Sequence, residues 1–339
     1  MNILGIETSC DDTGVAIVSA QTDGSFKILA NIIKSQDHTK TKGVVPEVAA
    51  RHHAQAIMPA LDEALSTAGL TKTDLDCVAV TYGPGLVACL LVGVEAAKTV
   101  AVMLNLPMVA VNHMEAHIAS TFIEHPHLKF PAVALLASGG HTMLVGMHDF
   151  QNFHLIGTTK DDAAGEAFDK VARMLDLPYP GGPAISLLAE QGDRLQYNFP
   201  KPMLNSDDFN FSFAGLKTSV LYHIRDHQPL SFQDRADVAA SFQESVIEVL
   251  VSKTWQAAKL HHAQTVILGG GVSANKALQL RLKMVLQETL PQTQLIIPSP
   301  GLFTDNGAMI AVAAAVRALK KDFDNWENIK VDPRLKIAN

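Results

Sequence analysis

The sequence predicts an α/β protein made of two similar units that face one another across a cleft. Short apolar strand patterns alternate with amphipathic helical patterns along the chain, which is typical of α/β folds. A strand, a polar turn and a second strand follow one another twice, once near the N-terminus and once near residue 138. The chain has 339 residues, 47% of them hydrophobic, which is enough for two separate cores. A nucleotide would bind in the cleft.

The first copy of this strand–turn–strand pattern lies at the start of the chain. Residues 2–8 are rich in isoleucine and leucine, residues 9–14 are polar, and residues 15–19 resume a strand pattern. The second copy consists of residues 132–137, 138–142 and 143–145. This repetition predicts two related halves.

Helical patterns with apolar residues at steps of three and four alternate with further short strands. The predicted helices lie at residues 48–69, 86–103, 114–123, 162–175, 234–261 and 276–288. The additional predicted strands lie at residues 77–81, 108–111, 265–268 and 295–297. Residues 179–213 are richer in proline, glycine, asparagine and aspartate, so we expect loops or an insertion near the cleft there.

We expect no targeting leader and no membrane span. The first residues enter a strand pattern directly, without a charged or apolar leader. No apolar run reaches the roughly 18–20 residues of a membrane helix, because residues 87–94 are followed by Glu95 and Lys98. These features predict a cytoplasmic protein without a membrane partner.

Cysteine content and charge exclude two further classes. Cys10, Cys77 and Cys89 are widely spaced and form no C-x-x-C pair, which fits a reducing compartment and argues against a thiolate zinc site. The formal net charge is −7, so the chain lacks the excess of lysine and arginine with which a stand-alone nucleic-acid binder contacts phosphates.

His113 and His117 are separated by four residues, which places both imidazoles on one face of a helix, close enough to share a cation. The chain has 14 histidines, and His223 and His227 show the same spacing in what we interpret as an ordinary surface helix. From spacing alone, a metal site and a pair of solvated neighbours both remain open.

The position of the histidine pair favours a functional site. His113 directly follows the predicted strand 108–111, where α/β proteins bind ligands, and Asn112 is suited to cap the helix. A zinc peptidase would need the general-base glutamate of an H-E-x-x-H motif. Glu115 lies about 200° around the helix from His113, so it points away from the shared face and disfavours a peptidase.

Two glycine-containing turns suggest contacts with phosphate or adenine. The turn 138–142 offers backbone N–H groups that could bind a phosphate or carboxylate, although a plain hairpin turn would look the same. Gly269, Gly271 and Ala274 satisfy G-x-G-x-x-A, but the next strand, residues 295–297, lacks the acid that binds a ribose in Rossmann enzymes. The missing acid disfavours a Rossmann oxidoreductase, and the chain has no P-loop.

Two acidic residues stand out among many surface acids. Asp11 lies in the first polar turn and Asp305 lies in a loop before an apolar helix, and both are places where a carboxylate can face a ligand. Asp305 could equally cap that helix, and the residues alone slightly favour the cap.

Taken together, ten motifs resemble the TsaD family, the bacterial tRNA N6-adenosine threonylcarbamoyltransferases once described as O-sialoglycoprotein endopeptidases. The resemblance is dense and runs nearly from end to end. The motifs lie at residues 5–13, 43–47, 83–86, 113–117, 138–142, 162–170, 180–183, 211–218, 269–275 and 304–308.

The resemblance implies the fold of actin, Hsp70 and hexokinase, with two ribonuclease H-like lobes and an active-site cleft between them. The expected N-terminal lobe covers residues 1–131 and the C-terminal lobe residues 132–304. A C-terminal helix at about residues 305–325 would pack back on the first lobe.

The resemblance also implies site residues. His113, His117 and Asp305 match the ligands of a divalent metal ion, with Fe²⁺ preferred and Zn²⁺ as the alternative. The residues that match binding positions for threonylcarbamoyl-AMP are Leu136, Ala137, Ser138, Gly139, Gly140, Asp169, Gly182 and Asn275. Some relatives carry an acid shortly after the Pro-Gly-Gly-Pro turn, whereas Ala184-Ile185-Ser186 follows here, so no carboxylate is assigned to the ribose.

The implied reaction transfers the threonylcarbamoyl group from AMP to N6 of the adenosine 3′ of the anticodon in tRNAs that read codons starting with A. We hypothesise that Asp11 positions or deprotonates the attacking amine. The implied partners are TsaB and the ATPase TsaE, with TsaC making the adenylate. The competing hypotheses are a small-molecule kinase, which would use both turns for ATP without needing the histidine pair, and a catalytically silent scaffold like TsaB.

Overall fold

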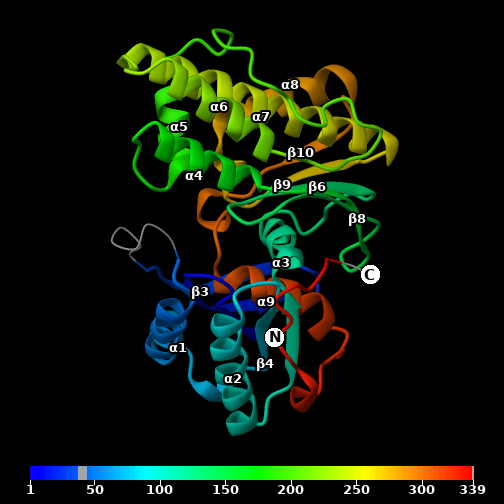
Figure 1. The fold of residues 1–339 in the computed structure, drawn as a ribbon. Helices are drawn as coiled ribbons and strands as arrows, with labels where there is room; N and C mark the ends of the chain where they lie inside the picture. The colour runs from blue at the N-terminus through cyan, green and yellow to red at the C-terminus, as the bar shows by residue number, and fades with distance from the viewer. Residues whose placement is uncertain (37–43, 338–339) are drawn as a thin grey trace. The chain divides into compact units, whose positions relative to one another are not determined.

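The computed structural model describes residues 1–36 and 44–337, so Gly43 of the motif at residues 43–47 lies outside the described residues. The chain folds as two compact units. The first consists of Met1–Leu128 and Pro298–Asn339, and the second of Lys129–Ile297. The chain therefore leaves the first unit once, forms the whole second unit, and returns (Figure 1).

Within the described residues, the strands of the first unit form a five-stranded sheet in the order β3-β2-β1-β4-β5. β1 pairs antiparallel with β2, and β2 with β3, while β4 is parallel to β1 and β5 is parallel to β4. The strands are β1 (Asn2–Glu7), β2 (Thr13–Ala20), β3 (Phe26–Lys34), β4 (Cys77–Gly83) and β5 (Met108–Asn112).

Helices cover both faces of this sheet. α1 (Pro46–Ala68) and α2 (Val87–Leu104) share an apolar core with alternate residues of β1, such as Leu4 and Ile6. Gly5 points to the opposite face, where α9 (Gly307–Ala318) packs. A β-carbon on Gly5 would lie 2.2 Å from the carbonyl oxygen of Gly307, so glycine permits the close approach of α9 to β1.

α2 has the 18 residues and the apolar composition of a membrane span, contrary to our expectation that no apolar run is long enough. A core helix of a globular protein has the same features. α2 packs against β4 and α1 within the first unit. Its apolar character therefore has a structural explanation inside the fold.

The strands of the second unit form another five-stranded sheet within the described chain, in the order β10-β9-β6-β7-β8. β6, β7 and β8 are antiparallel neighbours, β9 is parallel to β6, and β10 is parallel to β9. This plan repeats the plan of the first sheet, which confirms the prediction of two related halves. The strands are β6 (Ala132–Ala137), β7 (Thr142–Met147), β8 (Phe153–Thr158), β9 (Thr265–Gly269) and β10 (Gln294–Ile296).

The helices of the second unit pack around α7. A reciprocal capping box of Ser231 and Asp234 stabilises the N-terminus of α7. Phe168 of α4 and Phe242 of α7 meet edge to face in this core. The helices are α4 (Ala164–Met174), α5 (Gly181–Ala189), α6 (Ala214–Asp226), α7 (Phe232–Leu260) and α8 (Lys276–Thr289).

Three elements were not predicted. α5 lies inside the segment 179–213, where we expected loops or an insertion, and the expectation of loops is wrong for the residues of this helix. The edge strands β3 and β8 were also missed. Their burial patterns are irregular, with several half-buried or exposed positions, because each is bordered by a neighbouring strand on one side only.

Candidate active site

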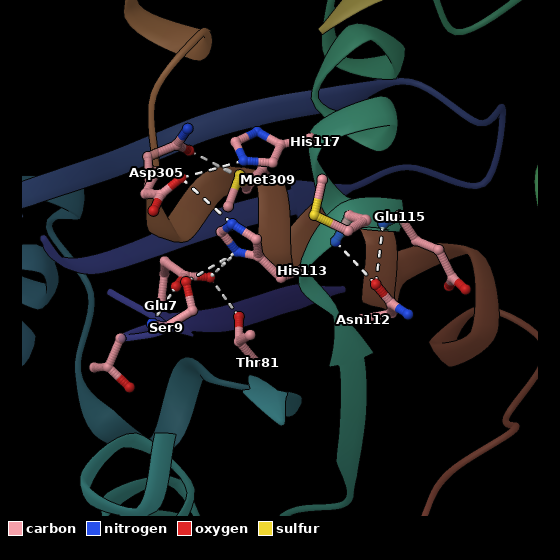
Figure 2. A network of polar contacts seen from close by, with 12 residues as sticks. Glu7, Ser9, Thr81, Asn112, His113, Glu115, His117, Asp305 and Met309 are labelled. Carbon is pink, nitrogen blue, oxygen red and sulfur yellow. Dashed lines mark hydrogen bonds and ion pairs between the residues drawn. The ribbon is translucent and has the colours of Figure 1, made fainter. Parts of the chain in front are cut away.

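The first unit holds the histidine pair at the start of α3 (His113–Ala119), directly after β5. The side chain of Asn112 accepts hydrogen bonds from the backbone N–H of Met114 (2.9 Å) and of Glu115 (3.4 Å), which confirms the predicted cap. This cap begins the helix at His113, so His113 and His117 share one face (Figure 2). Their ring centroids are 4.6 Å apart.

Asp305 approaches both imidazoles from the loop before α9. Its Oδ1 lies 3.2 Å from Nε2 of His117 and 3.5 Å from Nε2 of His113. The cap of α9 is Asn306, whose side chain accepts a hydrogen bond from the backbone N–H of Met309 at 3.0 Å. The expectation that Asp305 caps this helix is therefore wrong, and its carboxylate faces the histidines instead (Figure 2).

The three side chains fit the requirements of one divalent cation. One ligand atom from each residue can be chosen so that all lie within 4.8 Å of one another. Two ligand atoms bound at about 2.1 Å to one ion are separated by about 3.0 Å at an octahedral angle and about 3.4 Å at a tetrahedral angle. Of the two nitrogen–oxygen distances, 3.2 Å lies within this range and 3.5 Å lies just above it. Two imidazoles and one carboxylate suit iron or zinc and leave coordination positions open.

The buried carboxylate of Glu7 fixes the orientation of the His113 imidazole. Nδ1 of His113 lies 3.1 Å from Oε2 of Glu7 and 3.2 Å from Oγ of Ser9. Glu7 is fully buried, and it also accepts hydrogen bonds from the Ser9 backbone N–H and from the Thr81 hydroxyl. In the neutral imidazole, a carboxylate that accepts the Nδ1 proton leaves Nε2 of His113 unprotonated toward Asp305, the arrangement typical of metal-binding histidines. In contrast, the buried Nδ1 of His117 has no hydrogen-bond partner among the described residues.

The role of Glu7 was not predicted from the sequence, although Glu7 lies in the motif at residues 5–13. The available signal was a carboxylate inside an otherwise apolar strand, Asn2–Glu7. A fully buried charge is unfavourable unless it is paired or hydrogen-bonded. A carboxylate at such a position therefore indicates a buried polar partner elsewhere in the fold.

The electrostatics of this cluster favour a positive charge. Burial opposes ionisation of Glu7, but the charge and hydrogen bond of His113 outweigh burial and lower the pKa of the Glu7 carboxyl. Burial likewise opposes protonation of His113, but Glu7 and Asp305 raise the pKa of the imidazole to about 9. A proton on His113 thus balances the two carboxylates when no metal ion does so.

Asp11 lies half-buried in the turn between β1 and β2. The buried His53 of α1 holds this turn, with Nδ1 2.7 Å from Oγ1 of Thr13 and Nε2 3.0 Å from the carbonyl oxygen of Cys10. Burial raises the pKa of the Cys10 thiol, with Asp11 adding to the effect, so the thiol stays protonated.

Glu115 extends away from the histidine pair, on another side of α3 (Figure 2). Burial raises its pKa to about 7, with Arg317 acting in the opposite direction. The helix geometry behind the argument against a peptidase is therefore confirmed.

In the second unit, the end of β6 and the turn that follows carry five of the expected nucleotide-binding residues. Leu136 and Ala137 are buried, whereas Gly139 and Gly140 are exposed. Neither glycine has a neighbour within 4 Å of where a β-carbon would lie, so the backbone of this turn is accessible. The carbonyl oxygen of Ser138 accepts the backbone N–H of Gly165 at 3.1 Å, which ties the turn to the start of α4.

The remaining three nucleotide-binding candidates meet around α5. The Asp169 carboxylate accepts the backbone N–H of Gly181 at 2.7 Å, and Gly182 follows in the first turn of the helix. Burial raises the pKa of Asp169, partly offset by these backbone N–H groups. Asn275 caps α8 and donates a hydrogen bond to Ser186 of α5 at 2.9 Å. Part of the segment 179–213, where we expected loops or an insertion, thus forms the helix around which these three residues lie.

Comparisons with known proteins give a consistent result. The family profile described as "TsaD: tRNA N6-adenosine threonylcarbamoyltransferase" matches residues 27–312. A tRNA N6-adenosine threonylcarbamoyltransferase of Moorella thermoacetica is 49% identical over 326 residues, covering 95% of this chain and 93% of that protein. One of Thermosipho africanus is 44% identical and covers 99% of this chain and all of that protein (100%).

Solved structures with low sequence identity share the fold. Full-length HypF in its phosphate- and nucleotide-bound form matches with a TM-score of 0.59 and 17% identity, covering 94% of this chain and 55% of HypF. Component A of the (R)-2-hydroxyglutaryl-CoA dehydratase of Acidaminococcus fermentans matches with a TM-score of 0.54 and 18% identity, covering 95% of this chain and 99% of that one. The two-lobe fold of the actin, Hsp70 and hexokinase class is thus supported by its neighbours as well as by its topology. On the profile match and the identity to these transferases, the chain belongs to the TsaD family of tRNA N6-adenosine threonylcarbamoyltransferases.

Proposed function

We propose that this protein transfers the threonylcarbamoyl group from threonylcarbamoyl-AMP to N6 of the adenosine 3′ of the anticodon, in tRNAs that read codons starting with A. The product is N6-threonylcarbamoyladenosine. The observation that carries the proposal is the convergence of His113, His117 and Asp305, with Glu7 behind them, in a chain of the TsaD family.

His113, His117 and Asp305 would hold one divalent ion, Fe²⁺ by preference or Zn²⁺. Such an ion would supply Lewis acidity and a positive charge to orient the acyl-adenylate. The chain's own contribution at this site is to fix the donor atoms. The cap at Asn112 sets the helix face, and the Glu7 carboxylate sets the proton of His113 on Nδ1.

The second unit would bind the nucleotide part of the substrate. The accessible backbone N–H groups of the turn at Gly139 and Gly140 suit the phosphate, because amides can stabilise the negative charge of the departing AMP. Asp169, Gly182 and Asn275 surround α5 and suit contacts with the sugar and base.

The transfer itself is an acyl substitution. The adenosine N6 attacks the carbamoyl carbon, a C–N bond forms, and the bond between this carbon and the phosphate oxygen breaks with its electron pair leaving on AMP. The N6 nitrogen must lose one proton. Asp11, half-buried in the turn held by His53, is the proposed acceptor.

The proposed partners are tRNA as substrate, TsaB and TsaE as proteins that act with this enzyme in the cytoplasm, and TsaC as the source of the adenylate. Partner proteins would explain how a chain with net charge −7 acts on tRNA, since they could complete the binding surface.

The direct test is to incubate the purified protein with its partners, threonylcarbamoyl-AMP and unmodified tRNA, and to analyse the tRNA nucleosides by mass spectrometry. We expect N6-threonylcarbamoyladenosine with the wild-type protein and strongly reduced amounts with His113→Ala and Asp11→Asn. A parallel incubation with ATP and candidate sugars tests the kinase alternative. Phosphorylated sugar without modified adenosine would refute the proposal.

A further inference from the structure

A closed network of three polar side chains joins α5, α7 and α8 in the second unit. Asn275 Nδ2 lies 2.9 Å from Oγ of Ser186 and 2.7 Å from Oε1 of Gln243. Ser186 Oγ in turn donates to Oε1 of Gln243 at 2.9 Å. Each of the three residues therefore contacts the other two.

Each polar atom that meets in this network pairs as a donor with an acceptor. Asn275 Oδ1 accepts the backbone N–H of Leu278 at 3.0 Å, and this cap settles which atom of the amide is oxygen. Both hydrogens of Asn275 Nδ2 are then donated, one to the Ser186 hydroxyl and one to Gln243. The Ser186 hydroxyl accepts one hydrogen bond and donates one, and Gln243 Oε1 accepts two hydrogen bonds.

Gln243 is the fixed member of this group. It lies in the middle of α7 (Phe232–Leu260), between the fully buried Phe242 and the buried Ser245. α7 packs against both α5 and α8. Ser186, by contrast, lies on the shorter helix α5, and Asn275 is the cap that precedes α8. The oxygen of Gln243 therefore provides the reference point toward which the other two groups are oriented.

We propose that Gln243 is a positioning residue of the nucleotide subsite, which orients the Asn275 amide and the Ser186 hydroxyl for a bound nucleoside monophosphate. This inference rests on the proposed function, because it takes Asn275 to contact the nucleotide through the second lone pair of its Oδ1. Without the acceptor at Gln243, one hydrogen of Asn275 loses its partner, and only Ser186 and the N–H of Leu278 still hold the amide. A second anchor lies at the start of α5, where Asp169 holds the backbone N–H of Gly181.

The test is a double-mutant cycle on AMP binding, measured by isothermal titration calorimetry with the full chain. Gln243→Met keeps the length of the side chain but removes the acceptor. We expect it to weaken AMP binding by about tenfold, the usual effect of one lost hydrogen bond. In an Asn275→Ala background, Gln243→Met should change the affinity by less than about twofold, because the group that it orients is gone.

Gln256→Met is the matched control. Gln256 lies on the same helix, is likewise half-buried and donates a hydrogen bond to a serine, Ser252, at 3.0 Å, but it has no part in the network. It should bind AMP as the wild type does. If Gln243→Met fails to fold, as thermal unfolding would show, the same cycle is run with Ser186→Ala, which removes the other partner of Asn275.

The outcomes separate this inference from the proposed function. Wild-type affinity in Gln243→Met, or effects of Gln243→Met and Asn275→Ala that simply multiply, would overturn the positioning role alone. If the wild type does not bind AMP, or if Asn275→Ala binds it unchanged, the nucleotide subsite is wrongly assigned and the inference fails with it.

Discussion

Glu7→Gln should lower the metal affinity of the protein although Glu7 is not one of the three expected ligands. In the wild type, Glu7 Oε1 accepts the backbone N–H of Ser9, and Oε2 accepts from Thr81 and from Nδ1 of His113. All these contacts are buried, so no solvent can replace a lost partner. Glutamine has the same size but offers one oxygen and one NH₂ group.

Either orientation of the new amide creates a conflict. If its oxygen faces Ser9, its NH₂ group faces His113 Nδ1, which must then be unprotonated, and the imidazole proton moves to Nε2 and blocks metal binding. If the amide is reversed, its NH₂ group faces the N–H of Ser9 and a buried donor loses its acceptor. Changes to groups that orient metal-binding histidines typically reduce affinity by 10–100-fold. This corresponds to about 1.4–2.7 kcal/mol.

The assay is a competition between the metal-free protein and a chelator for Zn²⁺, followed by measurement of bound zinc. His117→Ala gives the affinity of a site that lacks one ligand. Glu115→Gln is the matched control. Glu115 is a partly buried carboxyl on α3, the helix of the two histidines, but it points away from them. It should bind zinc as the wild type does.

Thermal unfolding without metal shows whether Glu7→Gln still folds. Added zinc should then raise the melting temperature of the variant less than that of the wild type, because stabilisation by a ligand follows its affinity. A folded Glu7→Gln protein that binds zinc within about threefold of the wild type would refute the role assigned to Glu7.

Three further predictions concern the elements that support the site. Gly307→Ala places a β-carbon 2.4 Å from the backbone nitrogen of Ala16, so α9 must shift and carry Asp305 away. We expect a loss of about 2 kcal/mol or more in the free energy of unfolding and weaker zinc binding, and wild-type values for both would contradict the packing argument. Burial lowers the pKa of His53, so its contribution to stability is complete above the unfolded-state pKa of about 6.5 and is lost as pH falls through the folded-state value. His53→Gln should therefore lose less stability than the wild type in urea unfolding between about pH 7.5 and pH 5, and parallel curves would count against this reasoning. Lys253 is fully buried and donates hydrogen bonds to Oγ of Ser206 (3.0 Å) and to the carbonyl oxygen of Asp208 (2.7 Å). Lys253→Ala should lower the free energy of unfolding by about 3 kcal/mol, through the cavity and the lost hydrogen bonds. Lys253→Met should lower it by less than half of that, because methionine fills the space. Equal losses for the two variants in chemical denaturation would argue against a packing role.

Local features of the sequence predicted the parts of the site that depend on neighbours along the chain. The spacing of His113 and His117, the cap at Asn112 and the direction of Glu115 all follow from the geometry of a single helix turn. The two strand–turn–strand patterns were equally local, since each hairpin joins strands that are adjacent in sequence. These predictions needed no knowledge of tertiary packing.

The contact of Asp305 with the histidines could not be predicted from the pattern. It depends on α9, which follows the second unit in the chain and packs on the first sheet through the glycine contacts of Gly5 and Gly307. Local pattern alone favoured a helix cap for Asp305, and the neighbouring Asn306 takes that role. Only the resemblance to a family connected Asp305 to the pair.

α5 escaped prediction for a different reason. Its first residues, Gly181, Gly182 and Pro183, are typical of turns, and the helix spans only Gly181–Ala189. Its start is stabilised from outside, because Asp169 of α4 accepts the N–H of Gly181. A short helix that depends on a partner distant in sequence has no strong local signal.

In both units, the candidate site residues lie at the carboxyl ends of the parallel strands, but the residue types differ. In the first unit, the parallel strands β1, β4 and β5 end near Glu7, Thr81 and Asn112, and the histidine pair follows directly. In the second unit, the parallel strands β6 and β9 end at Ala137 and Gly269, which lead into the turn and the helix cap assigned to the nucleotide. Ligand sites at the carboxyl ends of parallel strands are the general rule for α/β sheets. The shared topology therefore explains where each proposed site lies. The residues placed there differ: carboxylates and imidazoles in the first unit suit the proposed cation, and glycines and amides in the second suit the proposed nucleotide.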